Sequence, residues 1–302
     1  MREASLFLLK IHTYYFSISR AGLKTRQWQQ SSPYAKMIKV MADFIMLRKG
    51  RNVLSSIVHV GLNIALAVVS TALTVISGNC VFAILLVILS KWRVIAVRPR
   101  YWWINIKSNL VDFIVGVSLA LLVSVAGSNG LNMWHVILTI IYAIWLVAIK
   151  PQSSIVFAQV QSLMAIFFGT FAVATIAAHA DPFLGCLVSF IIGYGASRHV
   201  LVQGDDVDFT LTTFLSGLIL AELTWVFYHW SIVYVIGTET VYAIPQLPIV
   251  ASLIFFTFAK GYTSALKHDG KIRMDDILLP AIFSVSLILV MIFCFSKANF
   301  DV

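Results

Sequence analysis

The sequence predicts an all-α bundle of transmembrane helices, on the grounds of composition, of long apolar runs and of the distribution of basic residues. The 302 residues are 60% hydrophobic and 12% charged, with a mean hydropathy of +0.90. Soluble proteins are about 25% charged and about 45–50% apolar. Long apolar runs inside lipid satisfy their backbone groups only as helices. The composition therefore indicates a polytopic membrane protein and excludes a disordered chain.

Nine segments are predicted to cross the membrane, because a span needs about 20 mostly apolar residues. They are 53–76, 80–97, 109–126, 131–149, 155–178, 182–202, 209–229, 241–259 and 277–296. Lys91 and Arg93 interrupt the end of the second segment and are expected to extend to the interface. Pro245 and Pro248 are expected to kink or break the eighth.

The basic residues set the predicted orientation. With a cytoplasmic N-terminus and nine spans, all but Lys297 of the 22 Lys and Arg residues lie on the inner side. The C-terminus is then outside. This distribution accounts for the net charge of +9, so we expect no nucleic-acid partner. The sequence has no Asn-x-Ser/Thr site, which favours a bacterial inner (plasma) membrane.

The chain is expected to have three parts. Residues 1–33 form a flexible or disordered arm, and residues 53–296 form the transmembrane domain. Between them, residues 34–51 place apolar side chains on one helical face and charged ones on the other. This pattern predicts an interfacial amphipathic helix, with an extended linker as the alternative.

Small residues recur at four-residue spacing in three of the predicted spans and so form stripes along one face of each helix. In membranes such stripes mark close contacts between helices. They are Gly116, Ala120 and Ser124; Gly185, Ser189, Gly193 and Ser197; and Thr213, Gly217 and Ala221. We expect these residues to serve helix packing.

Glu222 is the leading candidate for a functional residue, because ionisable groups inside a span are costly. It lies about 20 Å into the seventh span, near the midplane, and His229 follows two turns later. A carboxyl group that alternates between charged and neutral states suits a proton or cation carrier. The alternative is a structural Glu222 that hydrogen-bonds a neighbour such as Asn63 or Thr71.

Other polar residues inside or beside spans are weaker candidates. His59 and Asn63 form an i, i+4 pair that is either structural or part of a transport path. Asp112, near the inner surface, is expected to pair with Lys107 or an arginine, or else to bind substrate.

Basic and aromatic residues alternate after the second span. Arg98 and Arg100 could grip a lipid phosphate, with Trp102 and Trp103 at headgroup depth. The positive-inside bias and the aromatic belt together produce the same pattern, so both interpretations stay open.

One acidic cluster lies in an inner loop. Asp205, Asp206 and Asp208 could hold Mg²⁺ for a diphosphate substrate. Alternatively they are solvated loop residues, with Asp208 as the N-cap of the seventh span.

Two resemblances bear on function. The stretches Arg98-Pro-Arg-Tyr-Trp…Asn109-Leu-Val-Asp112 and Ala221-Glu222…Trp225…Tyr228-His229-Trp230 resemble uncharacterised polytopic membrane proteins of small-genome candidate-phylum bacteria. The nine-span architecture is similar to that of UbiA-type prenyltransferases. That resemblance implies Mg²⁺ at Asp-rich motifs, matched here by Asp112 and by Asp205, Asp206 and Asp208.

The expected function is that of an inner-membrane carrier or binder of a small solute or lipid, with Glu222 at a polar midplane site. Its partners are then membrane lipids and that ligand, and we expect no enzyme activity, no cofactor and no metal. The alternatives are a Mg²⁺-dependent prenyltransferase, which uses the four aspartates above, and a non-catalytic membrane scaffold.

Overall fold

The computed structural model describes residues 55, 57–126, 130–177, 181–203, 210–230, 232–236, 242–268 and 270–295. The predicted arm 1–33 and the predicted amphipathic helix 34–51 lie outside these residues. The chain divides into two units, Met1–Val60 and Gly61–Val302.

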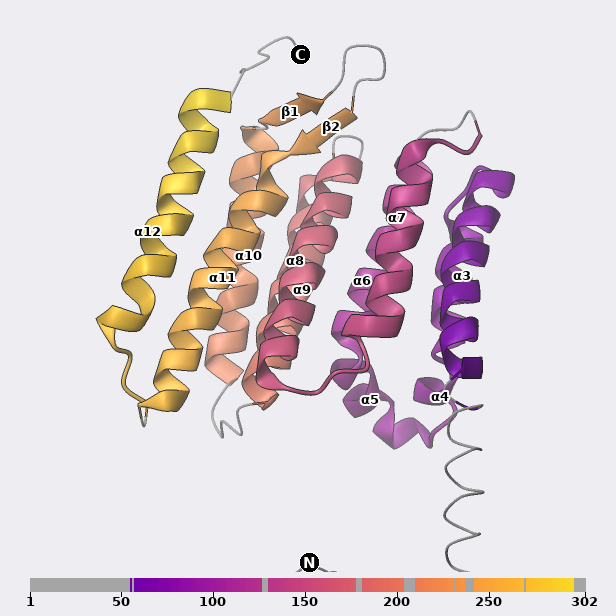
Figure 1. Cartoon of the computed structure of the whole chain (residues 1–302), viewed down its shortest axis with the longest axis horizontal. Coiled ribbons are helices and arrows are strands. Elements are labelled where there is room, and N and C mark those ends of the chain that lie inside the picture. Colours follow the sequence, from indigo (N-terminus) through magenta and orange to yellow (C-terminus); the bar gives the residue numbers. More distant parts are fainter. Residues whose placement is uncertain are drawn as a thin grey trace, which may run out of the picture. The chain divides into compact units, whose positions relative to one another are not determined.

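Six helices of the described residues are long and apolar enough to cross a membrane, which indicates a multi-pass membrane protein. The six helices of this bundle, seen in Figure 1, are Ile57–Ser77, α8 (Ile155–Ala177), α9 (Pro182–Gln203), α10 (Thr210–His229), α11 (Gln246–Lys267) and α12 (Met274–Val290). A π-helical turn, Met291–Phe295, continues α12.

The remaining three predicted spans take shorter or bent forms. The second is split into α3 (Val81–Ser90) and α4 (Trp92–Ile95). The fourth is α7 (Met133–Ile144), which a π-helical segment, Trp145–Ile149, extends. The third is α6 (Leu110–Val125).

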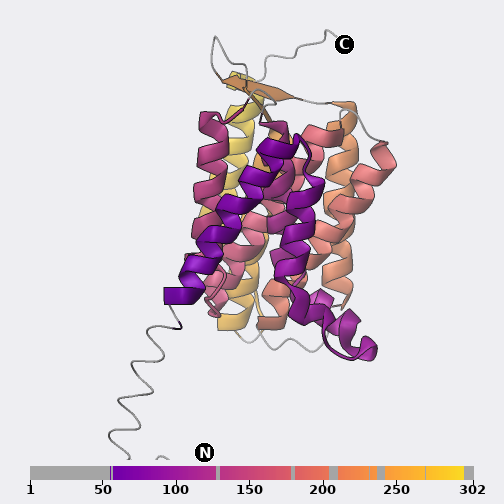
Figure 2. The ribbon, with the colours of Figure 1, turned by 90° about the vertical axis from the view of Figure 1, so that its right-hand side faces the viewer.

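A bend precedes α6. The segment Pro99–Ser108, which contains a 3₁₀ turn (Pro99–Tyr101) and α5 (Trp102–Ser108), meets α6 at an angle of 68°. Figure 2 shows α5 leaving the direction of α6. At the bend, Asn109 donates from Nδ2 to the carbonyl of Asn105 at 2.9 Å. The bent pair counts as a seventh candidate span if its two parts form one.

The eighth predicted span begins later than expected, and a β-hairpin precedes it. Strand β1 (Val233–Ile236) pairs antiparallel with β2 (Tyr242–Pro245), with Val233 opposite Pro245. Helix α11 then starts at Gln246, and Pro248 lies in its first turn, where the missing N–H removes no intrahelical hydrogen bond. The prolines therefore set the start of a continuous helix and do not kink or break it. The predicted all-α fold did not include the β-hairpin.

Helices α9 and α10 pack closely through the predicted small residues. A Cβ added to Gly193 would lie 2.7 Å from the carbonyl oxygen of Ser216, and one added to Gly217 would lie 2.9 Å from that of Phe190. Thr224 Oγ1 also donates to Ser189 Oγ at 2.8 Å. The prediction that these stripes serve helix packing is confirmed for this pair.

The core of the second unit is apolar and joins α6, α8, α9 and α11. Its fully buried members include Val115, Ala165 and Ala196. Large apolar side chains also cover outward faces, such as Leu279 on α12, which is 77% exposed. Soluble proteins rarely expose so much contiguous apolar surface, whereas a membrane protein presents it to lipid.

Candidate functional site

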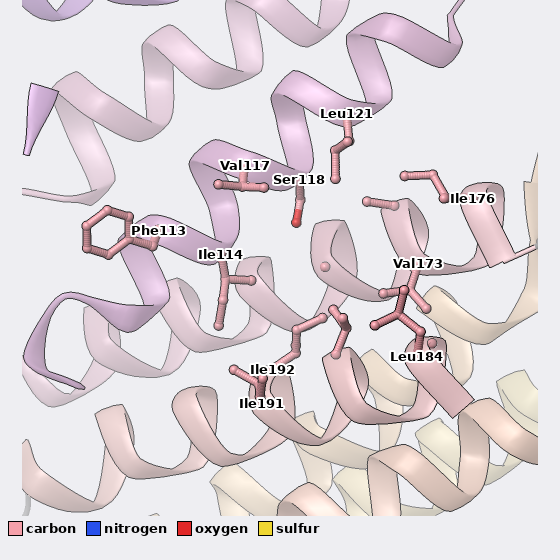
Figure 3. A pocket seen from close by; sticks show the side chains of 14 residues that line it. Phe113, Ile114, Val117, Ser118, Leu121, Val173, Ile176, Leu184, Ile191 and Ile192 are labelled. Carbon is pink, nitrogen blue, oxygen red and sulfur yellow. The ribbon is translucent and has the colours of Figure 1, made fainter. Parts of the chain in front are cut away.

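An apolar groove of about 320 Å³ lies between α6, α8 and α9 (Figure 3). Each helix contributes residues three or four positions apart, which therefore share one helical face. The lining residues are Phe113, Ile114, Val117, Ser118 and Leu121 of α6; Gly169, Ala172, Val173 and Ile176 of α8; and Leu184, Gly185, Val188, Ile191 and Ile192 of α9. Ser118 carries the only polar side chain among them.

The floor of the groove is tightly packed and its rim is open. A Cβ added to Gly169 would lie 2.9 Å from Ile192 Cδ1 and 3.2 Å from Ile114 Cγ2, so three helices converge at this glycine. In contrast, Leu184 and Val188 at the rim are exposed. The groove is therefore a fixed trough that opens on the surface of the bundle.

A largely buried charge cluster joins the first turn of α6 to residues near the ends of α3 and of the π-helical segment Trp145–Ile149. Asp112, in the first turn of α6, forms an ion pair with Lys91, which follows α3, and with Lys150, whose Nζ lies 2.8 Å from Asp112 Oδ2. Trp145 donates from Nε1 to Asp112 Oδ1 at 3.3 Å. We call these four residues the Asp112 cluster. Two lysine side chains share one carboxylate, so basic groups outnumber acidic groups in the cluster.

The structure differs from the sequence-based prediction in the partners of Asp112 and in the burial of Lys91. The sequence analysis expected Asp112 to pair with Lys107 or an arginine, whereas Lys107 lies over the Trp103 ring, 4.7 Å from its centroid. Lys91 was expected to extend to the interface but is only 8% exposed. Its burial is tolerable because Asp112, itself 12% exposed, supplies the opposite charge.

Phe113 connects the cluster to the groove. It follows Asp112 in the chain and lines the groove, and Lys91 Nζ lies 5.9 Å from the centroid of its ring. In Figure 3, Phe113 and Leu121 mark opposite ends of the part of α6 that lines the groove. One end of the groove is therefore close to the two lysines of the Asp112 cluster.

Gln161 of α8 organises the chain beside Lys150. Its Nε2 donates to the carbonyls of Ile149 and Gln152 at 2.8 and 3.0 Å, which lie at and just beyond the end of the π-helical segment. Its Oε1 accepts from Nε2 of His199 on α9 at 2.7 Å. Gln161 thus positions the backbone from which the Lys150 side chain reaches Asp112. This role could not be predicted from the sequence, because Gln159 and Gln161 in an apolar run form no pattern that distinguishes one of them.

Glu222 and His229 lie on the exposed face of α10. Glu222 lines neither the groove nor a second, smaller pocket between α8, α9, α10 and α11. His229 donates from Nδ1 to the carbonyl of Trp225 at 3.0 Å and packs against the Trp225 ring. The neighbours suggested for Glu222 have other partners: Asn63 donates to the Leu146 carbonyl, and Thr71 hydrogen-bonds Thr139.

His59 lies in the first unit, and its side chain is exposed. The segment with Arg98, Arg100, Trp102 and Trp103 is also exposed along its length. Arg100 lies over the Tyr101 ring, and Trp102 donates from Nε1 to the Val97 carbonyl at 2.8 Å. This exposed aromatic and basic segment lies next to the bend before α6.

The predicted acidic cluster of Asp205, Asp206 and Asp208 lies outside the described residues. Among the residues that are described, no three His, Cys, Asp or Glu side chains gather in a way that could hold a metal ion. The fourth aspartate of that hypothesis, Asp112, has both of its oxygens engaged in the Asp112 cluster.

Comparison of the chain with models of protein families, with curated proteins and with solved structures finds no match.

Proposed function

We propose that this protein binds the hydrocarbon chain of a membrane lipid in the groove between α6, α8 and α9. The observation that carries the proposal is the apolar lining of the groove, in which Ser118 is the only polar side chain. Sites for small polar molecules place several polar groups around the ligand. Of the two ligand classes expected from the sequence, a solute and a lipid, the groove therefore favours the lipid.

A lipid chain gains little hydrophobic free energy when it enters such a groove, because the bilayer interior is equally apolar. Binding must come from dispersion contacts with a surface of fitting shape. The floor at Gly169 is suited to this because three helices fix its shape. Discrimination among lipids then depends on the headgroup.

We place the headgroup at the Phe113 end of the groove. Lys91 and Lys150 share one carboxylate there, and Lys91 Nζ lies 5.9 Å from the centroid of the Phe113 ring. Basic groups at headgroup depth attract anionic lipids. The proposed ligand class is therefore an anionic phospholipid or another lipid with a phosphate-bearing headgroup.

The proposed setting is a bacterial inner membrane, with nine spans, the N-terminus in the cytoplasm and the C-terminus outside. Its support is that each predicted span overlaps an apolar helix, six of which are long enough to cross a membrane, together with the distribution of basic residues. Single cysteines at Ser153 and Asn132, on opposite sides in this topology, test it in intact cells. An impermeant maleimide should label Asn132→Cys and spare Ser153→Cys; the reverse pattern would invert the orientation.

Photo-crosslinking tests the groove. The protein in lipid nanodiscs is irradiated with a diazirine-labelled phospholipid, and the modified peptides are mapped by mass spectrometry. We expect the label to concentrate on groove residues such as Val117 and Ile176. Val188→Trp, at the rim, should fill the groove and reduce that label.

Val160→Trp is the matched control, because Val160 and Val188 are both 38% exposed and Val160 does not line the groove. It should leave the labelling of the groove unchanged. Labelling spread over all exposed apolar positions in proportion to their exposure would refute the proposal.

Neither Glu222 nor Mg²⁺ takes part in the proposed binding of lipid. Glu222 lines neither described pocket, so nothing in the geometry favours it as the centre of a transport path. The prenyltransferase hypothesis requires Asp112 as a Mg²⁺ ligand, and the two lysines that neutralise Asp112 do not favour that role.

A further inference from the structure

We infer that helix α10 is the interface between two copies of this protein in the membrane, with Glu222 of each copy in contact with its counterpart. Glu222 lies 12 residues after Thr210, about 18 Å along the helix, and its side chain is exposed. Among the described residues, no hydrogen bond or ion pair reaches its carboxyl group. This inference is independent of the lipid-binding proposal.

The surroundings of Glu222 make an unpaired carboxyl group costly. Its neighbours on the exposed face of α10 include Leu218, Ile219 and Val226, which are apolar and also exposed. Polar groups that face lipid without a partner are strongly unfavourable, and helices in membranes relieve this cost by hydrogen bonds to other helices. A partner outside the described chain is therefore expected at Glu222.

The exposed face of α10 has the residue spacing of a helix-pairing seam. Six of its exposed residues lie at alternating intervals of four and three, which is the a/d pattern of a left-handed helix pair, and Phe214, Ile219 and Val226 are exposed beside them. The six residues are Leu211, Leu215, Leu218, Glu222, Trp225 and His229. The opposite face, with Thr213, Gly217, Leu220 and Thr224, is buried. Since α9 already occupies that face, this second seam is available to another helix.

A second copy fits this seam better than an unrelated helix does. About a two-fold axis along the membrane normal, each residue meets its counterpart at the same depth. A carboxyl group is self-complementary in this arrangement, because a protonated carboxyl donates a hydrogen bond that the other carboxyl accepts. Glu222 and His229 occupy equivalent seam positions, seven residues apart, and a single polar residue at such a position typically fixes register.

Disulfide cross-linking tests the seam. In a cysteine-free background reconstituted in liposomes, Leu215→Cys and Leu218→Cys should form disulfide-linked dimers under mild oxidation. Leu279→Cys on α12 is the control, because that residue is 77% exposed and lies on another helix. Equal cross-linking at Leu279, or none at either seam position, would overturn the inference.

The role of Glu222 is tested by energy transfer between two fluorophore-labelled populations at increasing lipid dilution. Glu222→Leu should raise the dimer dissociation constant about tenfold, because it removes the hydrogen bond between the two carboxyl groups. Glu222→Gln keeps a donor and an acceptor and should stay close to the unmodified protein. A Glu222→Leu dimer as tight as the unmodified one, a monomer at every dilution, or labelling of Glu222→Cys by a water-soluble maleimide would each contradict the inference.

Discussion

Lys150 Nζ lies 2.8 Å from Asp112 Oδ2, and this contact joins the end of α7 to the start of α6. Lys91 pairs with the same carboxylate from the end of α3. One carboxylate thus pairs with two lysines that come from different parts of the chain. The stability of the protein should therefore depend far more on Asp112 than on either lysine of the cluster.

Asp112→Asn should destabilise the protein by about 3 kcal/mol or more, because it leaves two ammonium groups without an anion in a buried site. Lys150→Gln should cost about 1 kcal/mol or less, because the Lys91–Asp112 pair stays intact and Lys150 is 35% exposed. Reversible unfolding in mixed micelles, followed by circular dichroism, measures both. Equal losses for the two variants would contradict the shared-anion interpretation.

Gln161→Leu should destabilise the protein by about 2–3 kcal/mol. The substitution deprives the carbonyls of Ile149 and Gln152 and the imidazole of His199 of a hydrogen-bond partner. The same unfolding assay applies. Gln152→Leu is the control, because that side chain is exposed and a change there should stay within about 0.5 kcal/mol.

Much of the helical architecture could be predicted from the sequence, because membrane spans follow from apolar length alone. The packing of α9 on α10 was also predictable, since Gly193 and Gly217 belong to regular stripes. The β-hairpin was not, because short apolar segments such as Tyr242–Pro245 do not distinguish strand from helix by their pattern.

The groove and the cluster could not be predicted, because both depend on contacts between residues far apart in the chain. The sequence does not distinguish Val117 and Val188 from other lipid-facing valines, because their shared groove exists only once α6 and α9 pack side by side. Similarly, Lys91 resembles an interfacial lysine until Asp112 is brought to it. The sequence indicated the depth of Glu222 but not the direction in which its side chain points.

Gly193→Ala should separate α9 from α10 and destabilise the protein by about 1–3 kcal/mol. The added methyl group would lie 2.7 Å from the Ser216 carbonyl oxygen, which is backbone and cannot move without the helix. Gly61→Ala is the matched control, because no atom lies within 4 Å of a Cβ built there. That control should be neutral or more stable by up to about 1 kcal/mol, since alanine favours helix.

Lys150→Gln should also weaken the proposed preference for anionic lipid about tenfold, because it removes the more exposed of the two basic side chains beside the groove. Competition between phosphatidylglycerol and phosphatidylcholine with identical acyl chains measures this preference in the photo-crosslinking assay. Labelling of the groove by phosphatidylcholine alone should not change, because the groove itself is intact.

Lys107→Gln provides the comparison that separates a local site from general attraction to a basic surface. It removes the same unit of charge from the segment that precedes α6 but leaves the Asp112 cluster complete. A lipid preference that falls equally in both variants would mean that the surface potential of this end, rather than Lys150, selects the headgroup. A loss confined to Lys150→Gln would locate the phosphate beside Asp112, because only that variant changes the charge of the cluster.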